Sequence, residues 1–97
     1  FKYIYKKQLE SILNENDCLI AFSTSGTSSN IIEAMKFAKS ILNKNKIFLI
    51  TGNLKSSKID ESIAIIKTPI DGNTETYQEF HLLLIHIVCN ILEKTYV

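Results

Sequence analysis

The stretch that decides the fold is Ser23-Thr24-Ser25-Gly26-Thr27-Ser28. It follows the apolar run at residues 19–22, which has the length of a buried strand, and precedes an amphipathic segment that begins near Asn30. A strand, a hydroxyl-rich turn and a helix in this order are typical of α/β proteins. Gly26 allows the backbone to turn sharply and to approach a ligand closely.

The chemistry of this loop suits a phosphate group. Five of its six residues carry a short hydroxyl side chain, and the next helix directs its free N–H groups and the positive end of its dipole to the same place. The loop contains no Lys or Arg, which favours reversible capture of a small sugar phosphate over binding of a nucleoside triphosphate. Ser, Thr and Gly also form loops that bind nothing. However, open α/β sheets bind their ligands at the carboxyl ends of strands, where this loop lies.

Size and composition limit the possible classes of protein. The 97 residues suffice for one small domain, and an apolar content of 45% supports a packed core. A net charge of +1, with scattered basic residues, argues against a nucleic-acid binder. No apolar run approaches the ~20 residues of a membrane helix, and no signal peptide is recognisable, so we expect a cytoplasmic protein without membrane partners. The first residue is Phe1, from which we expect a fragment.

The apolar spacing predicts alternating helices and strands. We expect helices at 1–15, 30–42 and 75–94, strands at 17–22, 47–50 and 62–67, and a short helix or irregular connection at 55–61. The last helix has a wide apolar stripe, so we expect it to be largely buried. The alternation predicts a parallel sheet. Three strands leave open sheet edges, which indicates that part of the domain is absent.

Smaller features lead to further expectations. Asn30 with Glu33, and Thr76 with Glu79, have the spacing of capping boxes at helix starts. The two cysteines have apolar neighbours, so we expect them in the core of a protein from a reducing compartment rather than in a disulfide or a metal site.

The two histidines, His81 and His86, both lie on the last predicted helix. On pattern alone, a lone histidine in an apolar helix is a hydrogen-bonded structural residue, although histidine also moves protons near neutral pH. Gln78, at the start of this helix, is able to cap it or to face a ligand. Gln78 and His86 are eight residues apart, a rise of ~12 Å along a helix. No spacing rule therefore pairs them at one metal ion.

Three blocks of the sequence resemble a known family. Residues 17–30 are similar to the phosphate-loop signature of sugar isomerase (SIS) domains. Leu49-Ile50-Thr51-Gly52, and Gln78-Glu79-Phe80-His81-Leu82 with His86, resemble one branch of that family, the sedoheptulose 7-phosphate isomerases, or phosphoheptose isomerases. The resemblance covers nearly all of this chain but only the C-terminal half of such an enzyme. It implies that residues 1–97 are the C-terminal part of a single SIS domain, a flavodoxin-like α/β three-layer sandwich with a parallel sheet.

The resemblance also implies an activity and a site. Enzymes of this branch convert sedoheptulose 7-phosphate to glycero-manno-heptose 7-phosphate, an aldose–ketose isomerisation through an enediol that leads toward the heptose of lipopolysaccharide and capsule. Gln78 would match a residue that touches both the substrate and a zinc ion, and His86 would match a zinc ligand that also acts as acid or base. The residues implied to hold the substrate phosphate are Ser23, Thr24, Ser25 and Ser28.

This chain departs from the family pattern in two ways. The other catalytic carboxylate and a His–Glu metal pair belong to the N-terminal half, so we expect this stretch alone to be inactive. Glu75 stands where the family usually has Asp, and we assign His81 a structural role.

The resemblance further implies a homotetramer. The alternative is a non-catalytic SIS module that binds phosphosugars in a replication-initiation or transcription regulator, but the presence of both Gln78 and His86 favours the enzyme.

Overall fold

The computed structural model describes residues 1–52, 63–69 and 72–96. In chain order, its elements are α1 (Ile4–Ile12), β1 (Leu19–Ser23), α2 (Ser29–Lys39), a short 3-10 helix (Lys44–Lys46), β2 (Ile47–Thr51), β3 (Ala64–Lys67) and α3 (Thr74–Tyr96). The helices and strands expected in this part of the sequence are present, with ends that differ by a few residues. The connection expected at 55–61 lies outside the described residues.

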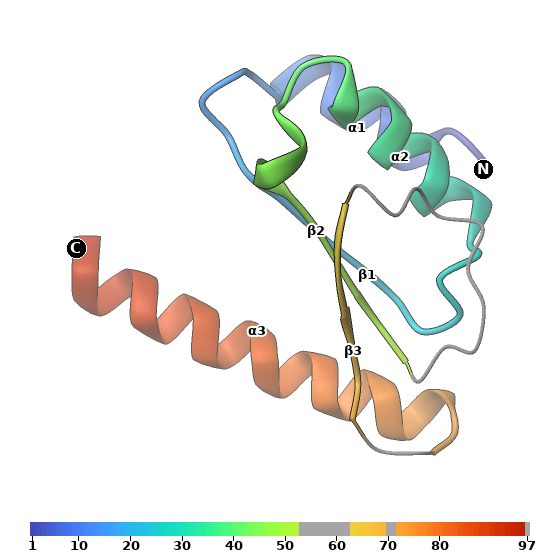
Figure 1. The fold of residues 1–97 in the computed structure, drawn as a ribbon, viewed down its shortest axis with the longest axis vertical. Coiled ribbons are helices and arrows are strands. Elements are labelled where there is room, and N and C mark those ends of the chain that lie inside the picture. Colours follow the sequence, from blue (N-terminus) through green and yellow to red (C-terminus); the bar gives the residue numbers. More distant parts are fainter. Residues whose placement is uncertain (53–62, 70–71, 97) are drawn as a thin grey trace.

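The three strands form one parallel sheet in the order β1-β2-β3. Ser23 pairs with Thr51, and Thr51 pairs with Lys67, so the carboxyl ends of the strands lie at one edge of the sheet. Figure 1 shows α1 and α2 on one side of the sheet and α3 on the other, which gives three layers. The α/β class and the parallel sheet predicted from the sequence are confirmed.

The face of the sheet beneath α2 holds the hydrophobic core. Alternate residues of β1 and β2 point to this side, and Ile47, Leu49 and Ala38 are completely buried there. The buried core cluster consists of Ala21, Met35, Ala38, Leu42, Ile47, Leu49 and Ile63. Each large apolar side chain buried in this way stabilises the fold by about 1.5–3 kcal/mol. This face therefore holds the fold together.

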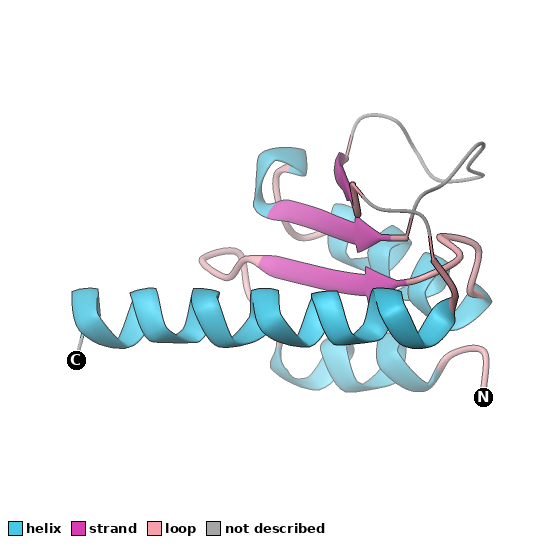
Figure 2. Ribbon diagram, turned by 90° about the horizontal axis from the view of Figure 1, so that it is seen from below, coloured by secondary structure: helices cyan, strands magenta, loops and turns pink. Residues whose placement is uncertain are grey.

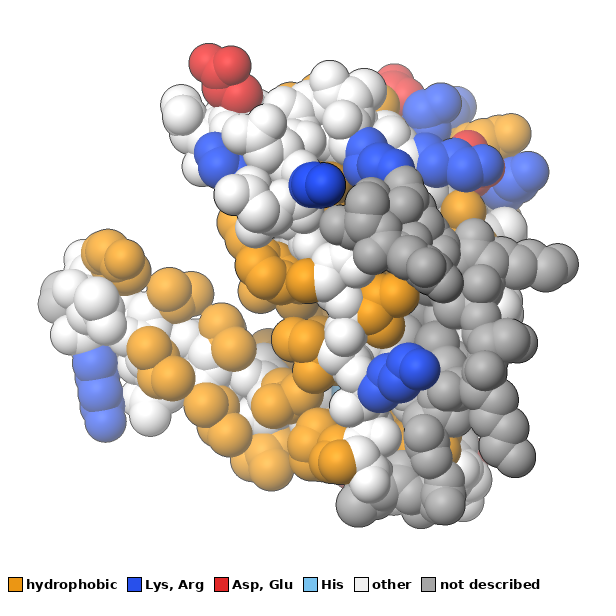
Figure 3. All heavy atoms as spheres, in the orientation of Figure 1, with side chains coloured by type: hydrophobic (Ala, Val, Ile, Leu, Met, Phe, Trp, Pro, Cys, Tyr) orange, Lys and Arg blue, Asp and Glu red, His pale blue; other side chains and the backbone are white. Residues whose placement is uncertain are grey.

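The opposite face of the sheet is covered only in part. α3 starts near the carboxyl edge of the sheet and runs back along the strands (Figure 2), and the only residue of α3 that is buried is His81. Leu83 is 55% exposed and Ile91 is 58% exposed, and a row of hydrophobic side chains along α3 faces open space (Figure 3). The expectation of a largely buried helix is thus wrong, because in the described part of the chain no element covers the outer side of α3.

The helix starts also differ from the predicted capping boxes. Ser28, the N-cap of α2, makes no side-chain cap bond, and the Asn30 Oδ1 accepts the backbone N–H of Ile31 at 2.8 Å instead. At α3, the Asn73 Oδ1 accepts both the backbone N–H and the hydroxyl of Thr76, each at 2.9 Å. Asn73 therefore caps α3, as Asn commonly does one residue before a helix, and both predicted boxes are wrong.

Two further observations concern the surface. Cys18 and Cys89 are both exposed, so the expectation that they lie in the core is wrong. Cys18 precedes β1, and Cys89 lies on the exposed part of α3. Among the described residues, no helix combines the length and apolar character needed to cross a membrane.

Candidate functional site

The loop between β1 and α2 turns at Gly26, whose φ of 69° lies in the left-handed region that favours glycine. The buried Ser23 hydroxyl accepts the backbone N–H of Gly26 at 3.0 Å and donates to the Ser28 hydroxyl at 3.3 Å. The Ser25 hydroxyl accepts both the N–H and the hydroxyl of Thr27, each at 3.1 Å. Because Ser25 and Ser28 act as acceptors in these bonds, their own hydroxyl protons are available to a ligand.

The first turn of α2 adds backbone donors to this loop. The first N–H groups of a helix have no acceptor within the helix, and the side chain of Ser28 does not cap them. The positive end of the helix dipole lies at the same place. The loop and helix start therefore offer an anion several neutral donors, without a Lys or Arg in the loop.

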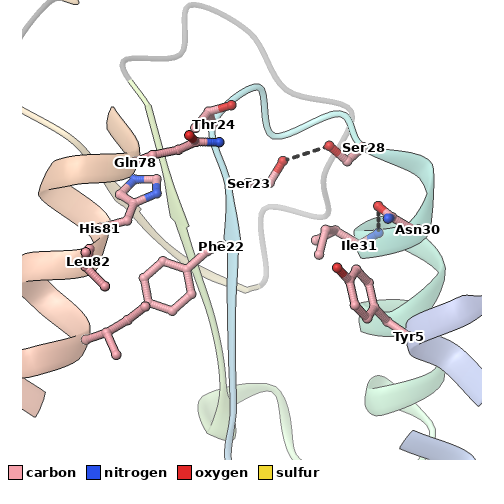
Figure 4. A pocket seen from close by; sticks show the side chains of 11 residues that line it. Tyr5, Phe22, Ser23, Thr24, Ser28, Asn30, Ile31, Gln78, His81 and Leu82 are labelled. Carbon is pink, nitrogen blue, oxygen red and sulfur yellow. Dashed lines mark hydrogen bonds between the residues drawn. The ribbon is translucent and has the colours of Figure 1, made fainter. Parts of the chain in front are cut away.

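The loop and α3 line one cavity of about 540 Å³. Four of the residues predicted to bind substrate lie in its wall: Ser23, Thr24, Ser28 and Gln78. Figure 4 shows Gln78 extending from α3 toward Thr24. The remaining walls are formed by Tyr5, Phe22, Asn30, Ile31, His81, Leu82 and Ile85. Hydroxyl groups at one end and an amide on the facing helix suit a ligand with a phosphate and a polar carbon chain.

Two predicted site residues do not line this cavity. Ser25 and His86 are both exposed and are absent from its wall. His86 lies about two turns beyond Gln78 on the same helix, a rise of ~12 Å. This chain therefore does not bring Gln78 and His86 together at the cavity, and the roles predicted for Ser25 and His86 stay predictions. Glu75 lies in the first turn of α3 and is also exposed.

Gly52 bonds to the loop and lies close to Tyr77, and the sequence analysis assigned a role to neither residue. The backbone N–H of Gly52 donates to the carbonyl oxygen of Thr24 at 3.0 Å. A Cβ atom at Gly52 would lie 2.6 Å from Cδ2 of Tyr77 and 2.7 Å from the same carbonyl oxygen. The Tyr77 hydroxyl in turn accepts the backbone N–H of Gly72 at 3.2 Å. A glycine directly after a buried strand was the available signal for such a close approach.

His81 is buried in a polar cluster at the carboxyl ends of β2 and β3, as its predicted structural role requires. Its Nε2 lies 3.0 Å from the carbonyl oxygen of Thr51 and 3.2 Å from the hydroxyl of Thr68. The ring of Phe22 packs against it at a centroid distance of 5.5 Å. These contacts attach the first two turns of α3 to the sheet.

The described residues do not form a zinc site by themselves. They contain no group of three or more His, Cys, Asp and Glu side chains that could hold a metal ion. A catalytic zinc ion usually has three protein ligands and one open position, whereas the resemblance assigns only Gln78 and His86 to the metal within this chain.

Comparison with known proteins gives one consistent result, although no protein-family model matches the sequence. The phosphoheptose isomerase of Campylobacter jejuni is 37% identical over 98 residues, which are 97% of this chain and 49% of that protein. That of Buchnera aphidicola is 38% identical over 97% of this chain and 47% of its own length. The chain thus spans about half the length of the curated relatives it matches.

Solved structures lead to the same family. The structure of a phosphoheptose isomerase from Francisella tularensis matches with a TM-score of 0.80 and 29% identity, over 98% of this chain and 50% of that one. The phosphoheptose isomerase from Neisseria gonorrhoeae matches with a TM-score of 0.76, also at 29% identity, over 98% of this chain and 52% of that one. In both sequence and fold, this chain is therefore similar to about half of a phosphoheptose isomerase.

Proposed function

We propose that this chain belongs to an enzyme that isomerises sedoheptulose 7-phosphate to glycero-manno-heptose 7-phosphate. One observation carries the proposal: the cavity in which three loop residues face Gln78 at the carboxyl edge of a parallel sheet. The similarity to half of several phosphoheptose isomerases supports it. On the family resemblance alone, we place the reaction on the route to the heptose of lipopolysaccharide or capsule, and the cytoplasm stays its expected compartment.

The cavity residues have distinct parts in this proposal. Ser23, Thr24 and Ser28, with the N–H groups at the start of α2, bind the phosphate oxygens, and Ser25 adds its hydroxyl from the rim of the loop. The Gln78 amide both donates and accepts, so it is suited to orient the hydroxyl and carbonyl groups near the reacting carbons. The isomerisation then needs a base to remove the proton beside the carbonyl and an acid to return it at the neighbouring carbon.

His86 is our candidate for one acid/base group, supplied to a cavity that the rest of the enzyme completes. It lies on the exposed apolar part of α3, which suits burial against another subunit. We propose a homotetramer on this ground and on the resemblance. The resemblance assigns Gln78 and His86 to a zinc ion, but this chain does not bring the two side chains together. Any zinc site would therefore need ligands and positioning from outside the described residues.

The test is an isomerisation assay on the full-length protein with two neighbouring variants. Gln78→Ala should lower kcat/KM by about 10- to 100-fold, because a substrate group left without its hydrogen-bond partner costs about 1–3 kcal/mol. Glu79→Ala is the matched control, since Glu79 is exposed and does not line the cavity, and its kinetics should match the wild type. A wild-type protein that binds sedoheptulose 7-phosphate without converting it would instead favour the non-catalytic SIS module.

A further inference from the structure

We propose that His81 is a positioning residue that sets the place of Gln78 relative to the phosphate-binding loop. It does so through a buried hydrogen bond to the end of β2, the same point of the sheet that holds the loop. This inference rests on the proposed function, which assigns Gln78 to the sugar. It gives His81 a part separate from that of His86.

The hydrogen-bond geometry defines how His81 acts. Its Nε2 lies 3.0 Å from the carbonyl oxygen of Thr51, and because a carbonyl oxygen only accepts, Nε2 carries a proton and donates it. The Thr68 hydroxyl donates to the same carbonyl at 2.5 Å and lies 3.2 Å from Nε2. The exposed fractions are 5% for His81, 1% for Thr68 and 0% for Thr51. Water therefore offers little replacement for these bonds if one partner is removed.

Two adjacent residues connect α3 to the loop: Thr51, the last residue of β2, and Gly52, which follows it. Thr51 accepts the bond from His81, and the next residue, Gly52, donates its N–H to the carbonyl of Thr24 at 3.0 Å. Gln78 and His81 are three residues apart, so they lie on one face of α3 about one turn apart. Both line the cavity with Thr24, as Figure 4 shows.

The consequence for the reaction follows from this chain of contacts. The anchor of α3 is the Thr51 carbonyl and the anchor of the loop is the Gly52 N–H, which belong to one peptide group. The distance from Gln78 to Thr24 is therefore set locally. The phosphate loop has its own hydrogen bonds through Ser23. Loss of the His81 bond should therefore displace Gln78 while leaving the phosphate site intact. Displacing a substrate-positioning group by about 1 Å can cost about 100-fold in rate.

The experiment uses the full-length protein and three variants. His81→Phe keeps a ring but removes the donor, and His81→Gln restores an amide N–H at similar reach. His81→Asn keeps an amide, but its shorter side chain does not reach the Thr51 carbonyl. Three properties are measured for each variant: the affinity for inorganic phosphate by calorimetry, the kinetics of sedoheptulose 7-phosphate isomerisation well below the Tm, and the Tm itself.

We expect His81→Phe to retain the phosphate affinity of the wild type while kcat/KM falls by about 10- to 100-fold, and His81→Gln to recover most of that loss. Wild-type kinetics with only a lowered Tm would overturn the proposal, because His81 would then be merely structural. An inactive His81→Gln would also overturn it, since His81 would then act on the substrate itself.

If His81→Phe does not fold, His81→Asn decides the question, because it removes the bond to the Thr51 carbonyl but keeps a polar side chain. A lowered kcat/KM with unchanged phosphate affinity supports the positioning role, and unchanged kinetics contradicts it. A wild-type protein without isomerase activity refutes the proposed function rather than the role of His81, so the two failures are distinguishable.

Discussion

The two faces of the parallel sheet differ in how completely this chain covers them. Beneath α2, Ile47 and Leu49 have no exposed surface. On the other face, Ile20 is 41% exposed and Ile66 is 48% exposed, and α3 contributes a single buried side chain, His81. The first face is complete and holds the fold, whereas the second is open and carries the helix that presents Gln78.

This difference shows which parts of the candidate site are held in place by this chain alone and which are not. The loop between β1 and α2 and the start of α3 are held by contacts within the described residues. The exposed part of α3, with His86 and a row of apolar side chains, has no such contacts to fix its role. The relatives that this chain matches are about twice as long, and in our proposal the remainder and other subunits complete the open face.

The largest expected effect is that of His86, on the open face. In the full-length protein, His86→Ala should lower turnover by about 100-fold or more, because acid/base residues contribute roughly 10²–10⁴-fold. Asn90→Ala, one turn further along α3 and also exposed, is the control and should leave turnover unchanged. Near-normal turnover of His86→Ala, measured by the isomerisation assay, would remove His86 from the mechanism and leave the open face as an interface only.

The second prediction compares the two faces directly in the 97-residue chain. Leu49→Ala should lower the free energy of unfolding by about 2–5 kcal/mol, because it leaves a cavity in a closely packed core. Ile66→Ala should cost about 1 kcal/mol or less, since about half of this side chain is already in water. Urea unfolding measures both values. Equal costs would contradict the contrast between a covered and an open face.

The smallest of the three effects concerns the border between the faces. Gly52→Ala should lower the free energy of unfolding by about 1–3 kcal/mol and weaken phosphate binding, because the new methyl group would press on Tyr77 and on the loop carbonyl of Thr24. Asn45→Ala, at an exposed position away from this contact, is the control and should change neither the stability nor the phosphate affinity. A Gly52→Ala protein with the stability and affinity of the control would show that this contact does not hold the loop.

Much of the fold could be predicted from local pattern. The short apolar runs at 19–22 and 47–50 each precede a polar or glycine-containing turn, and buried parallel strands require that pattern. The hydroxyl-rich loop could be placed at the end of its strand for the same reason. The starts of the helices were harder to predict, because both Asn73 and Thr76 are suitable N-cap residues and the sequence alone does not decide between them.

The exposure of α3 could not be predicted, because a helical stripe shows that a helix face is apolar and not what covers it. The exposure of Cys89 follows from the same open face. The parts played by Gly52 and Tyr77 depend on an approach between β2 and α3 that no short-range pattern encodes. The place of His86 outside the cavity likewise depends on the path of α3 and not on residue spacing alone.

The absence of any Lys or Arg from the loop proposed to bind phosphate has a consequence for the effect of salt on binding. Attraction between separated full charges weakens as dissolved salt accumulates around them. Hydroxyl and amide dipoles act only at contact distance, where little screening by ions takes place. A ligand held in this way should therefore lose less affinity in concentrated electrolyte than a ligand held by Lys or Arg side chains.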